Sequence, residues 1–208
     1  FSRNDNTLFL WGRNQQKLNF LTHQLSTRNC HIFTTKVDFN LQAEISKACN
    51  LMGNNLKCLD VLIHCTGITS FGNIQSFGKE HMDQAIQVNL KAPVWITKNL
   101  LPQLIDGKGL VVFLNSRIID LNRPGMGLYD ITKSGLQAFA DTLRNEYGSQ
   151  GIRVTNLYLG KTATPMLEEL HKVHNQTYTP EAYIQPKDVA DMIKKITIKI
   201  ILDRFSPA

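Results

Sequence analysis

The stretch "GLVVFLNSRIIDLNRPGMGLYDITKSG", residues 109–135, joins an apolar run to a segment with helical character. Its first part, 109–116, is rich in Val and Leu and ends on Ser116, which is typical of a buried strand in a parallel sheet. Tyr129 and Lys133 follow, four residues apart, and a helix that begins near Tyr129 would place both on one face. The pair alone allows two interpretations: a solvated polar turn, or a phenol whose acidity a nearby ammonium group adjusts.

The pattern of strand followed by helix recurs on both sides of this stretch. It predicts a doubly wound, Rossmann-like parallel sheet between two layers of helices, in a single domain that covers residues 1–208. Strands are expected at 7–12, 31–37, 58–65, 109–116, 152–159 and 197–202, and helices at 14–25, 41–54, 79–105, 129–149 and 187–195.

The composition is that of an ordinary globular protein, with 42% hydrophobic and 19% charged residues in a chain of 208. The net charge of +6 comes from dispersed Lys and Arg residues, so a solvated basic surface is favoured over nucleic-acid binding. No apolar run approaches the length of a membrane span, and the four cysteines show neither paired spacing nor zinc-ligand spacing. We therefore expect a soluble, cytoplasmic protein with free thiols, no metal and no membrane or nucleic-acid partner.

In a doubly wound fold, ligands bind beyond the carboxyl ends of the strands. Each residue that directly follows a predicted strand is therefore a candidate for the site. These candidates are Arg13, Asp38, Thr66, Gly67, Ser116, Gly160 and Thr162.

The order Ser116, then Tyr129-x-x-x-Lys133, after a strand of such a fold resembles the short-chain dehydrogenase/reductase superfamily. The resemblance covers essentially the whole chain. It runs through "WGRN" (11–14), "VD" (37–38), "LDVLIHCTG" (59–67), "VNL" (88–90), "LNS" (114–116), "LGKTAT" (159–164) and "PKDVA" (186–190).

The resemblance implies that Tyr129 protonates the alkoxide formed from a carbonyl, that Ser116 hydrogen-bonds the carbonyl, and that Lys133 holds the nicotinamide ribose. The chemistry agrees, since a phenol with a pKa near 10 is a poor acid at neutral pH unless a cation favours its ionised form. The alternative for Ser116 is a residue that caps a turn.

Asn89 lies on an otherwise apolar helical stripe, four residues before Pro93. Because proline has no N–H, the carbonyl of Asn89 loses its helical partner and is free to bind water. By the resemblance, that water would link Asn89 to Lys133 in a proton relay. The alternative is a proline kink with a hydrogen-bonded asparagine.

The resemblance also assigns residues to the cofactor. Arg13 would bind a ribose 2′-phosphate, which indicates NADP(H), and Asp38 would accept a hydrogen bond from the adenine amino group. A surface arginine and an ordinary turn residue are the respective alternatives. Further along, Gly67, Gly160, Thr162 and Thr164 would lie along the cofactor. The backbone at Thr162 would meet the carboxamide, and the hydroxyl of Thr164 would contact the carboxamide or a phosphate.

The chain departs from the family pattern in several places. The glycine-rich turn and the first strand and helix of the family are not among these residues, and we expect them to precede Phe1. His64, Cys65 and Thr66 stand where the family has Asn, Asn and Ala, and a core histidine is the alternative for His64. Arg117 follows Ser116 where small residues are usual; it could meet an anionic substrate, although a surface arginine is the simpler interpretation.

The segment 165–185 is expected to cover the substrate as a lid, with Met126, Met166 and Leu167 lining the pocket. Together these features predict an NADPH-dependent carbonyl reductase or alcohol dehydrogenase for a small molecule, assembled by resemblance as a homodimer or homotetramer. The alternative is a catalytically silent relative that binds NADP(H) as a sensor or serves as a protein-interaction module.

Overall fold

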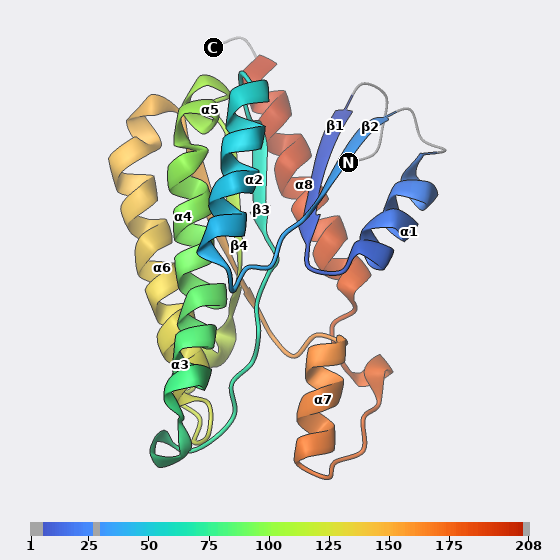
Figure 1. Ribbon diagram of the computed structural model, residues 1–208, viewed down its shortest axis with the longest axis vertical. Helices are drawn as coiled ribbons and strands as arrows, with labels where there is room; N and C mark the ends of the chain where they lie inside the picture. Colours follow the sequence, from blue (N-terminus) through green and yellow to red (C-terminus); the bar gives the residue numbers. More distant parts are fainter. Residues whose placement is uncertain (1–5, 27–29, 206–208) are drawn as a thin grey trace. The chain divides into compact units, whose positions relative to one another are not determined.

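The computed structural model describes residues 6–26 and 30–205 (Figure 1). The chain divides into two compact units, Phe1–Leu56 and Lys57–Ala208, which are described separately below. The prediction of a single domain over the whole chain stays a prediction.

The first unit contains one strand–helix–strand repeat followed by a second helix. Its elements are β1 (Asn6–Gly12), α1 (Gln15–Leu25), β2 (Cys30–Lys36) and α2 (Gln42–Asn55). The two strands are parallel, with Gly12 opposite Lys36 at their carboxyl ends, and the N–H of Val37 donates to the carbonyl of Gly12 over 3.0 Å. Arg13 and Asp38 therefore leave the sheet at the same edge.

The second unit is built on a parallel sheet in the order β3 (Val61–His64), β4 (Leu110–Ser116), β5 (Arg153–Leu159). Residues 110–113 of the central strand are fully buried because helices cover both faces of the sheet. The helices are α3 (Lys79–Ile86), α4 (Ala92–Asn99), α5 (Leu101–Asp106), α6 (Gly127–Tyr147), α7 (Pro165–Val173) and α8 (Pro186–Phe205).

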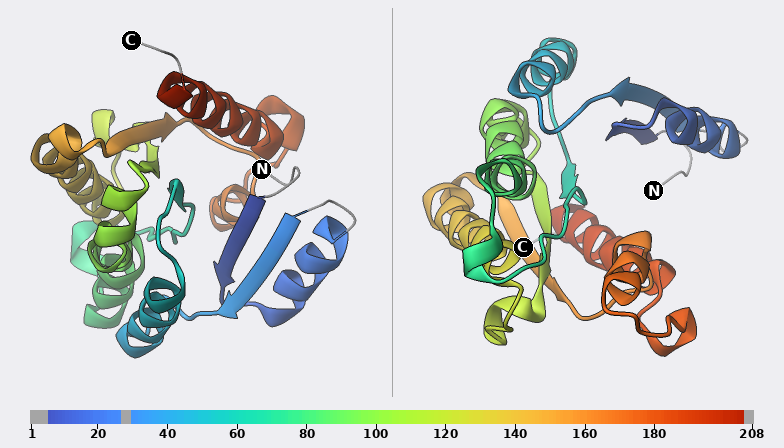
Figure 2. Two further views of the ribbon diagram at one scale, coloured as in Figure 1. Left: turned by 90° about the horizontal axis from the view of Figure 1, so that it is seen from above. Right: turned by 60° about the horizontal axis from the view of Figure 1, so that its bottom comes forward.

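Figures 1 and 2 show α4 and α6 on one side of this sheet and α8 on the other. On the α8 side, Val189 and Ile193 pack against Leu110, Val112 and Leu157 of the strands. This arrangement of parallel strands between helices confirms the Rossmann-like α/β fold class. Within the described residues the strands form two separate parallel sheets, one in each unit.

The strand predicted at 197–202 is wrong, because these residues belong to α8. The predicted helix at 187–195 continues through them without a break, and Thr197, fully buried, donates its hydroxyl hydrogen to the carbonyl of Ile193 over 2.9 Å. Val189 and Ile193, four residues apart, place one face of this helix on the sheet. Tertiary packing therefore overrides the β propensity of the Ile and Thr residues in the segment.

The single helix predicted at 79–105 is interrupted twice. A π-helical turn over Gln87–Lys91 separates α3 from α4, and Leu100 separates α4 from α5. Each interruption lies just before a proline, Pro93 or Pro102, which cannot donate the backbone hydrogen bond of a continuous helix.

None of the helices in the described part of the chain is long and apolar enough to cross a membrane.

Candidate active site

The candidate site lies at the carboxyl edge of the sheet in the second unit. Ser116 ends β4 and is paired in register with Leu159, which ends β5. The segments that follow these two strands therefore begin side by side, as the order of strands and helices predicts. The first turn of α6 brings Tyr129 to Ser116, with which its hydroxyl group is hydrogen-bonded.

Ser116 has two roles in the structure. Its Oγ accepts a hydrogen bond from the N–H of Ile118 over 3.2 Å, which begins the short 3-10 turn Arg117–Asp120. It also contacts Tyr129, so the capping interpretation and the site interpretation hold together. Burial raises the pKa of Tyr129 to about 12, and the hydrogen bond from Ser116 opposes part of this increase.

Lys133 is only 4% exposed, one turn beyond Tyr129 on α6. Its Nζ donates to the carbonyl of Leu114 over 2.9 Å and lies 5.6 Å from the centre of the Tyr129 ring. Burial lowers the pKa of Lys133 to about 8. The expected decrease in the pKa of Tyr129 is not found in this state, because burial of the phenol outweighs the hydrogen bond with Ser116, which lowers the pKa.

Asn115 fixes the strand to the helix, a role that the sequence analysis missed. Its Nδ2 donates to the carbonyl of Lys133 over 3.1 Å, and its Oδ1 accepts from the N–H of Ser116 over 2.8 Å. Both bonds are shielded from water, since Asn115 is buried. Together with the bond from Lys133 Nζ to the carbonyl of Leu114, this side chain therefore fixes the lysine relative to the serine. Its only sequence signal was its place directly before Ser116.

Asn89 is completely buried, and its side chain is fully engaged. Its Oδ1 accepts from the N–H of Ile68 over 2.8 Å, while its Nδ2 donates to the carbonyl of Ile68 over 2.8 Å and to Thr132 Oγ1 over 3.1 Å. Thr132 in turn donates to the carbonyl of Tyr129 over 2.7 Å. The side chain therefore ties the segment after β3 to the first turn of α6. The proposed relay through the Asn89 carbonyl stays a prediction.

Gly67 lies against the same groups. A Cβ atom at this position would come within 3.6 Å of Asn89 Oδ1 and 3.8 Å of Lys133 Nζ. Three predicted site residues, Gly67, Asn89 and Lys133, are therefore brought together from the loop after β3, the π-helical turn and α6. Cys65, two residues earlier, is an exposed free thiol.

His64 is a buried structural residue, as its alternative interpretation held. Its Nε2 lies 2.9 Å from Thr97 Oγ1, and its ring stacks on Phe113 with 5.0 Å between the ring centres. Burial lowers the pKa of His64 to about 3, so the ring stays neutral at physiological pH.

A pocket of about 410 Å³ opens at Ser116 and Tyr129. The predicted residues that line it are Ser116, Arg117, Met126, Tyr129, Gly160, Thr164, Met166 and Leu167. The lining residues that the sequence analysis missed are Thr69, Phe71, Ile118, Leu121, Arg123, Leu159, Lys161 and Leu170. Lys161 could have been predicted, because it lies between Gly160 and Thr162, two residues selected for their place after a predicted strand.

The segment beyond β5 is held by its own hydrogen bonds. Thr164 Oγ1 donates to the carbonyl of Thr162 over 3.2 Å and accepts from the N–H of Leu167 over 3.3 Å, which caps α7. Thr162 forms a β-bridge with Ile184, so both ends of the predicted lid, 165–185, are tied together. Thr162 itself does not line the pocket.

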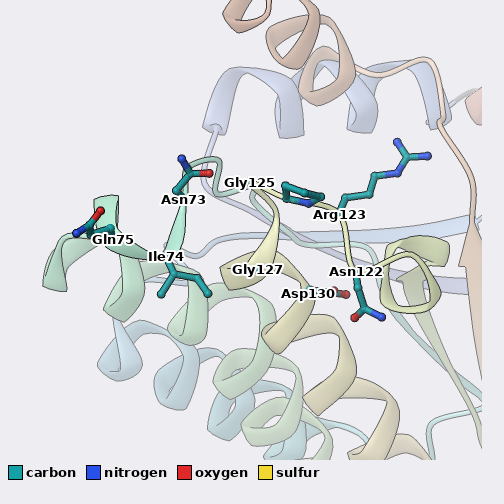
Figure 3. A pocket seen from close by; sticks show the side chains of 10 residues that line it. Asn73, Ile74, Gln75, Asn122, Arg123, Gly125, Gly127 and Asp130 are labelled. Atoms are coloured by element: carbon teal, nitrogen blue, oxygen red, sulfur yellow. The ribbon is translucent and has the colours of Figure 1, made fainter.

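A second pocket of about 520 Å³ lies beside the first, between the loops that surround residues 72–75 and 122–127 (Figure 3). Arg123 lines both pockets. Ser116, Tyr129 and Lys133 do not line the second pocket, so it is not the candidate active site.

The remaining predicted residues, Arg13 and Asp38, belong to the first unit. Arg13 is exposed directly after β1. Asp38 Oδ1 accepts hydrogen bonds from the backbone N–H and the side-chain Nδ2 of Asn40, over 2.9 Å and 3.0 Å. The turn interpretation of Asp38 thus has direct support, and its role toward adenine stays a prediction.

Comparison with known proteins places this geometry in a family. The family model described as short chain dehydrogenase matches residues 1–175. The chain is 26% identical to an uncharacterized oxidoreductase of Staphylococcus haemolyticus, over 88% of this chain and 77% of that protein. It is 30% identical to the mitochondrial D-beta-hydroxybutyrate dehydrogenase of Bos taurus, over 74% of this chain and 50% of that protein.

Among solved structures, the alcohol dehydrogenase from the archaeon Thermococcus sibiricus, complexed with 5-hydroxy-NADP, has a similar fold. The TM-score is 0.79 at 21% identity, over 91% of this chain and 79% of that one. At this identity the likeness shows the fold alone. The family model covers most of the chain, and the chain therefore belongs to the short-chain dehydrogenase family of oxidoreductases.

Proposed function

We propose that the chain is an NADPH-dependent reductase that converts the carbonyl group of a small molecule to an alcohol, or catalyses the reverse reaction. The observation that carries this proposal is the meeting of two hydroxyl groups, those of Ser116 and Tyr129, at one pocket, with the ammonium group of Lys133 one helical turn away. Two hydroxyl groups at one pocket can both donate hydrogen bonds to a carbonyl oxygen, which becomes an alkoxide during reduction.

A nicotinamide cofactor held beside Lys133 would supply the hydride for this reduction. Ser116 donates a hydrogen bond to the carbonyl oxygen and holds it in place. Tyr129, which is protonated at neutral pH because its pKa lies near 12, donates its proton to the oxygen as negative charge develops there. Lys133 supports the transfer as a cation near the phenol, and it would also donate hydrogen bonds to ribose hydroxyls.

Several residues fit a nicotinamide cofactor. Gly67 keeps the approach to Lys133 open, because a larger side chain there would lie over its Nζ. Thr162 and Thr164 would meet the carboxamide or a phosphate at the same edge of the sheet. In the first unit, Arg13 would bind the 2′-phosphate that distinguishes NADPH from NADH, and Asp38 would bind the adenine amino group. The Thermococcus sibiricus alcohol dehydrogenase, crystallised with a modified NADP, supports this choice of cofactor by analogy.

The proposal includes three further points. The protein acts in the cytoplasm as a homodimer or homotetramer, and the segment 165–185 covers the bound substrate. Exposed apolar residues on the outer helices, Met82, Trp95 and Ile131, support self-association. Size-exclusion chromatography with light scattering tests the oligomeric state, and a monomer at micromolar concentration would contradict the proposed homo-oligomer.

A second function deserves a test, because one observation favours it. The ammonium group of Lys133 is bonded to the carbonyl of Leu114, and the pKa of Tyr129 is raised rather than lowered. A protein that binds NADP(H) as a sensor, or that serves as an interaction module, would tolerate both features.

The decisive experiment compares the wild-type protein with Tyr129→Phe in a panel of aldehydes, diketones and β-keto esters, with NADPH oxidation as the signal. We expect Tyr129→Phe to lower kcat by about 10²- to 10⁴-fold, the contribution of a general acid. NADPH affinity, followed by tryptophan fluorescence, should stay within about twofold because the phenol ring is kept. Equal turnover by both proteins would refute the mechanism, whereas NADPH binding without turnover of any carbonyl would favour the sensor.

Cofactor preference is tested separately with Arg13→Ala. We expect this change to weaken NADPH binding by about tenfold or more and to leave NADH binding unchanged, because only the 2′-phosphate is affected. Equal weakening of both cofactors would contradict the role of Arg13.

A further inference from the structure

The pocket at Ser116 and Tyr129 has an unbalanced charge. Of the residues that line it, three carry a positive charge, Arg117, Arg123 and Lys161, and none is Asp or Glu. The rest of its wall is mainly apolar: Phe71, Ile118, Leu121, Met126, Leu159, Met166, Leu167 and Leu170. A neutral carbonyl compound would offer these three cations no opposite charge.

The three cations come from different parts of the second unit. Arg117 directly follows Ser116 at the end of β4, and Lys161 lies two residues beyond Leu159 at the end of the adjacent strand. Arg123 belongs to the loop that leads into α6, where its carbonyl accepts a hydrogen bond from the N–H of Met126 over 3.1 Å. The cations are therefore positioned by the same strand ends and helix that position the two hydroxyls.

None of these three side chains forms an ion pair with another described residue, although Lys161 Nζ lies 5.7 Å from the centre of the Tyr183 ring. The salt bridges found among the described residues join neighbours on single helices, for example Lys79 with Asp83, and do not involve Arg117, Arg123 or Lys161. Asp120, on the same turn as Arg117, does not line the pocket.

Arg123 lines the pocket with the hydroxyls as well as the second pocket. In Figure 3 its side chain extends away from Asn73, Ile74 and Gln75 of the second pocket. Its guanidinium group is therefore not directed at that side of the second pocket.

We propose that the substrate is an oxo acid or hydroxy acid, whose carboxylate is bound by Arg117, Arg123 and Lys161 while its carbonyl or hydroxyl group meets Ser116 and Tyr129. The apolar wall contacts the aliphatic chain between the two polar ends, and a pocket of about 410 Å³ is of the size that small ligands use. This inference rests on the proposed reductase function and names its substrate class. The bovine relative is named for a hydroxybutyrate, which carries a carboxylate.

The test uses two matched pairs of probes. Binding of hexanoate is compared with binding of hexanamide, which has nearly the same shape without the charge, and turnover of 5-oxohexanoate is compared with that of 5-oxohexanamide. We expect the wild-type protein to bind the acid about tenfold or more tightly than the amide, and to show a similar preference in kcat/KM. The variant Arg117→Gln/Arg123→Gln should lose this preference.

Two controls separate the possible sources of an effect. Lys187→Gln removes one charge from an exposed site on α8 outside the pocket, and it should keep the preference for the acid. NADPH affinity is measured for each variant, because the same cations could bind a cofactor phosphate. If the double variant weakens NADPH binding as much as hexanoate binding, the cations serve the cofactor and the inference is overturned.

The remaining outcomes distinguish this inference from the proposed function. Equal binding of hexanoate and hexanamide, together with turnover of neutral ketones, would overturn the inference and keep the reductase. A preference for hexanoate that the double variant loses, without turnover of any carbonyl in the panel, would keep the anion site and overturn the reductase.

Discussion

Replacing Lys133 by methionine should change how the stability of the protein depends on pH. Lys133 is buried, and its pKa falls from 10.5 to about 8 on folding. The folded state therefore binds fewer protons than the unfolded state between pH 8 and pH 10.5, so stability rises with pH across this window. Below pH 8 the full penalty of holding a buried ammonium group is present.

The size of the effect follows from the shift. At about 1.4 kcal/mol for each pKa unit, burial of Lys133 destabilises the folded state by about 3 kcal/mol at pH 7. Integration of the proton-binding difference from pH 7 to pH 9 gives a recovery of about 1.4 kcal/mol in the free energy of unfolding. Methionine removes the charge, but it leaves the carbonyl of Leu114 without its bond from Nζ, which costs about 1–3 kcal/mol at every pH.

The assay is urea unfolding of the wild type and of Lys133→Met at pH 7 and pH 9. We expect the wild type to gain about 1.4 kcal/mol more than the variant between the two pH values. Cys65 interacts electrostatically with Lys133, so both proteins are also compared in a Cys65→Ser background, in which the difference isolates Lys133. Lys195→Met, which removes an exposed lysine of α8, should behave like the wild type.

Parallel stability curves for the wild type and Lys133→Met would refute this reasoning, because they would mean that the ammonium group is solvated in the folded protein. If the difference is found, Lys133 destabilises the fold in the absence of ligand. A buried lysine that destabilises the fold indicates a functional role, and the proposed contact of Lys133 with a ribose is such a role.

Three further substitutions have expected outcomes. Burial lowers the pKa of His64 to about 3, so the folded protein resists protonation of this ring. The wild type should therefore lose about 2 kcal/mol in the free energy of unfolding between pH 7 and pH 5. His64→Gln, measured in the same urea titrations, should not show this loss. At Gly109 a Cβ atom would lie 2.5 Å from the carbonyl oxygen of Leu59, so Gly109→Ala should destabilise the fold by about 1–3 kcal/mol. Gly67→Ala meets only contacts of 3.6 Å and longer, so its thermal midpoint should stay close to that of the wild type; the reverse order of the two midpoints would contradict the packing argument.

The order of strands and helices could be predicted from the sequence because it depends on local periodicity. Buried parallel strands such as 110–116 are continuously apolar, and the helix that holds Tyr129 and Lys133 is amphipathic. Ser116 and Gly160 could be found because the ends of parallel strands meet at one edge of a sheet, whereas Tyr129 was found from its spacing to Lys133 and the family resemblance.

Features that depend on contacts between distant segments could not be predicted in this way. The β-branched residues near Thr197 have a local preference for a strand, and only their packing on the sheet makes them helical. Arg123 and Asn115 carry no periodic signal, because a loop and a strand end have none. Whether they face the site is decided by how the chain folds back on itself.

The sequence by itself therefore determined the type of fold, the family and the order of the reactive groups. Tertiary structure alone decided their environment: the burial that moves the pKa of Tyr129 upward and that of Lys133 downward, and the side chain of Asn89 that joins the loop after β3 to α6. The physical reason is that periodicity and spacing are local, whereas desolvation and charge balance depend on every segment that surrounds a group.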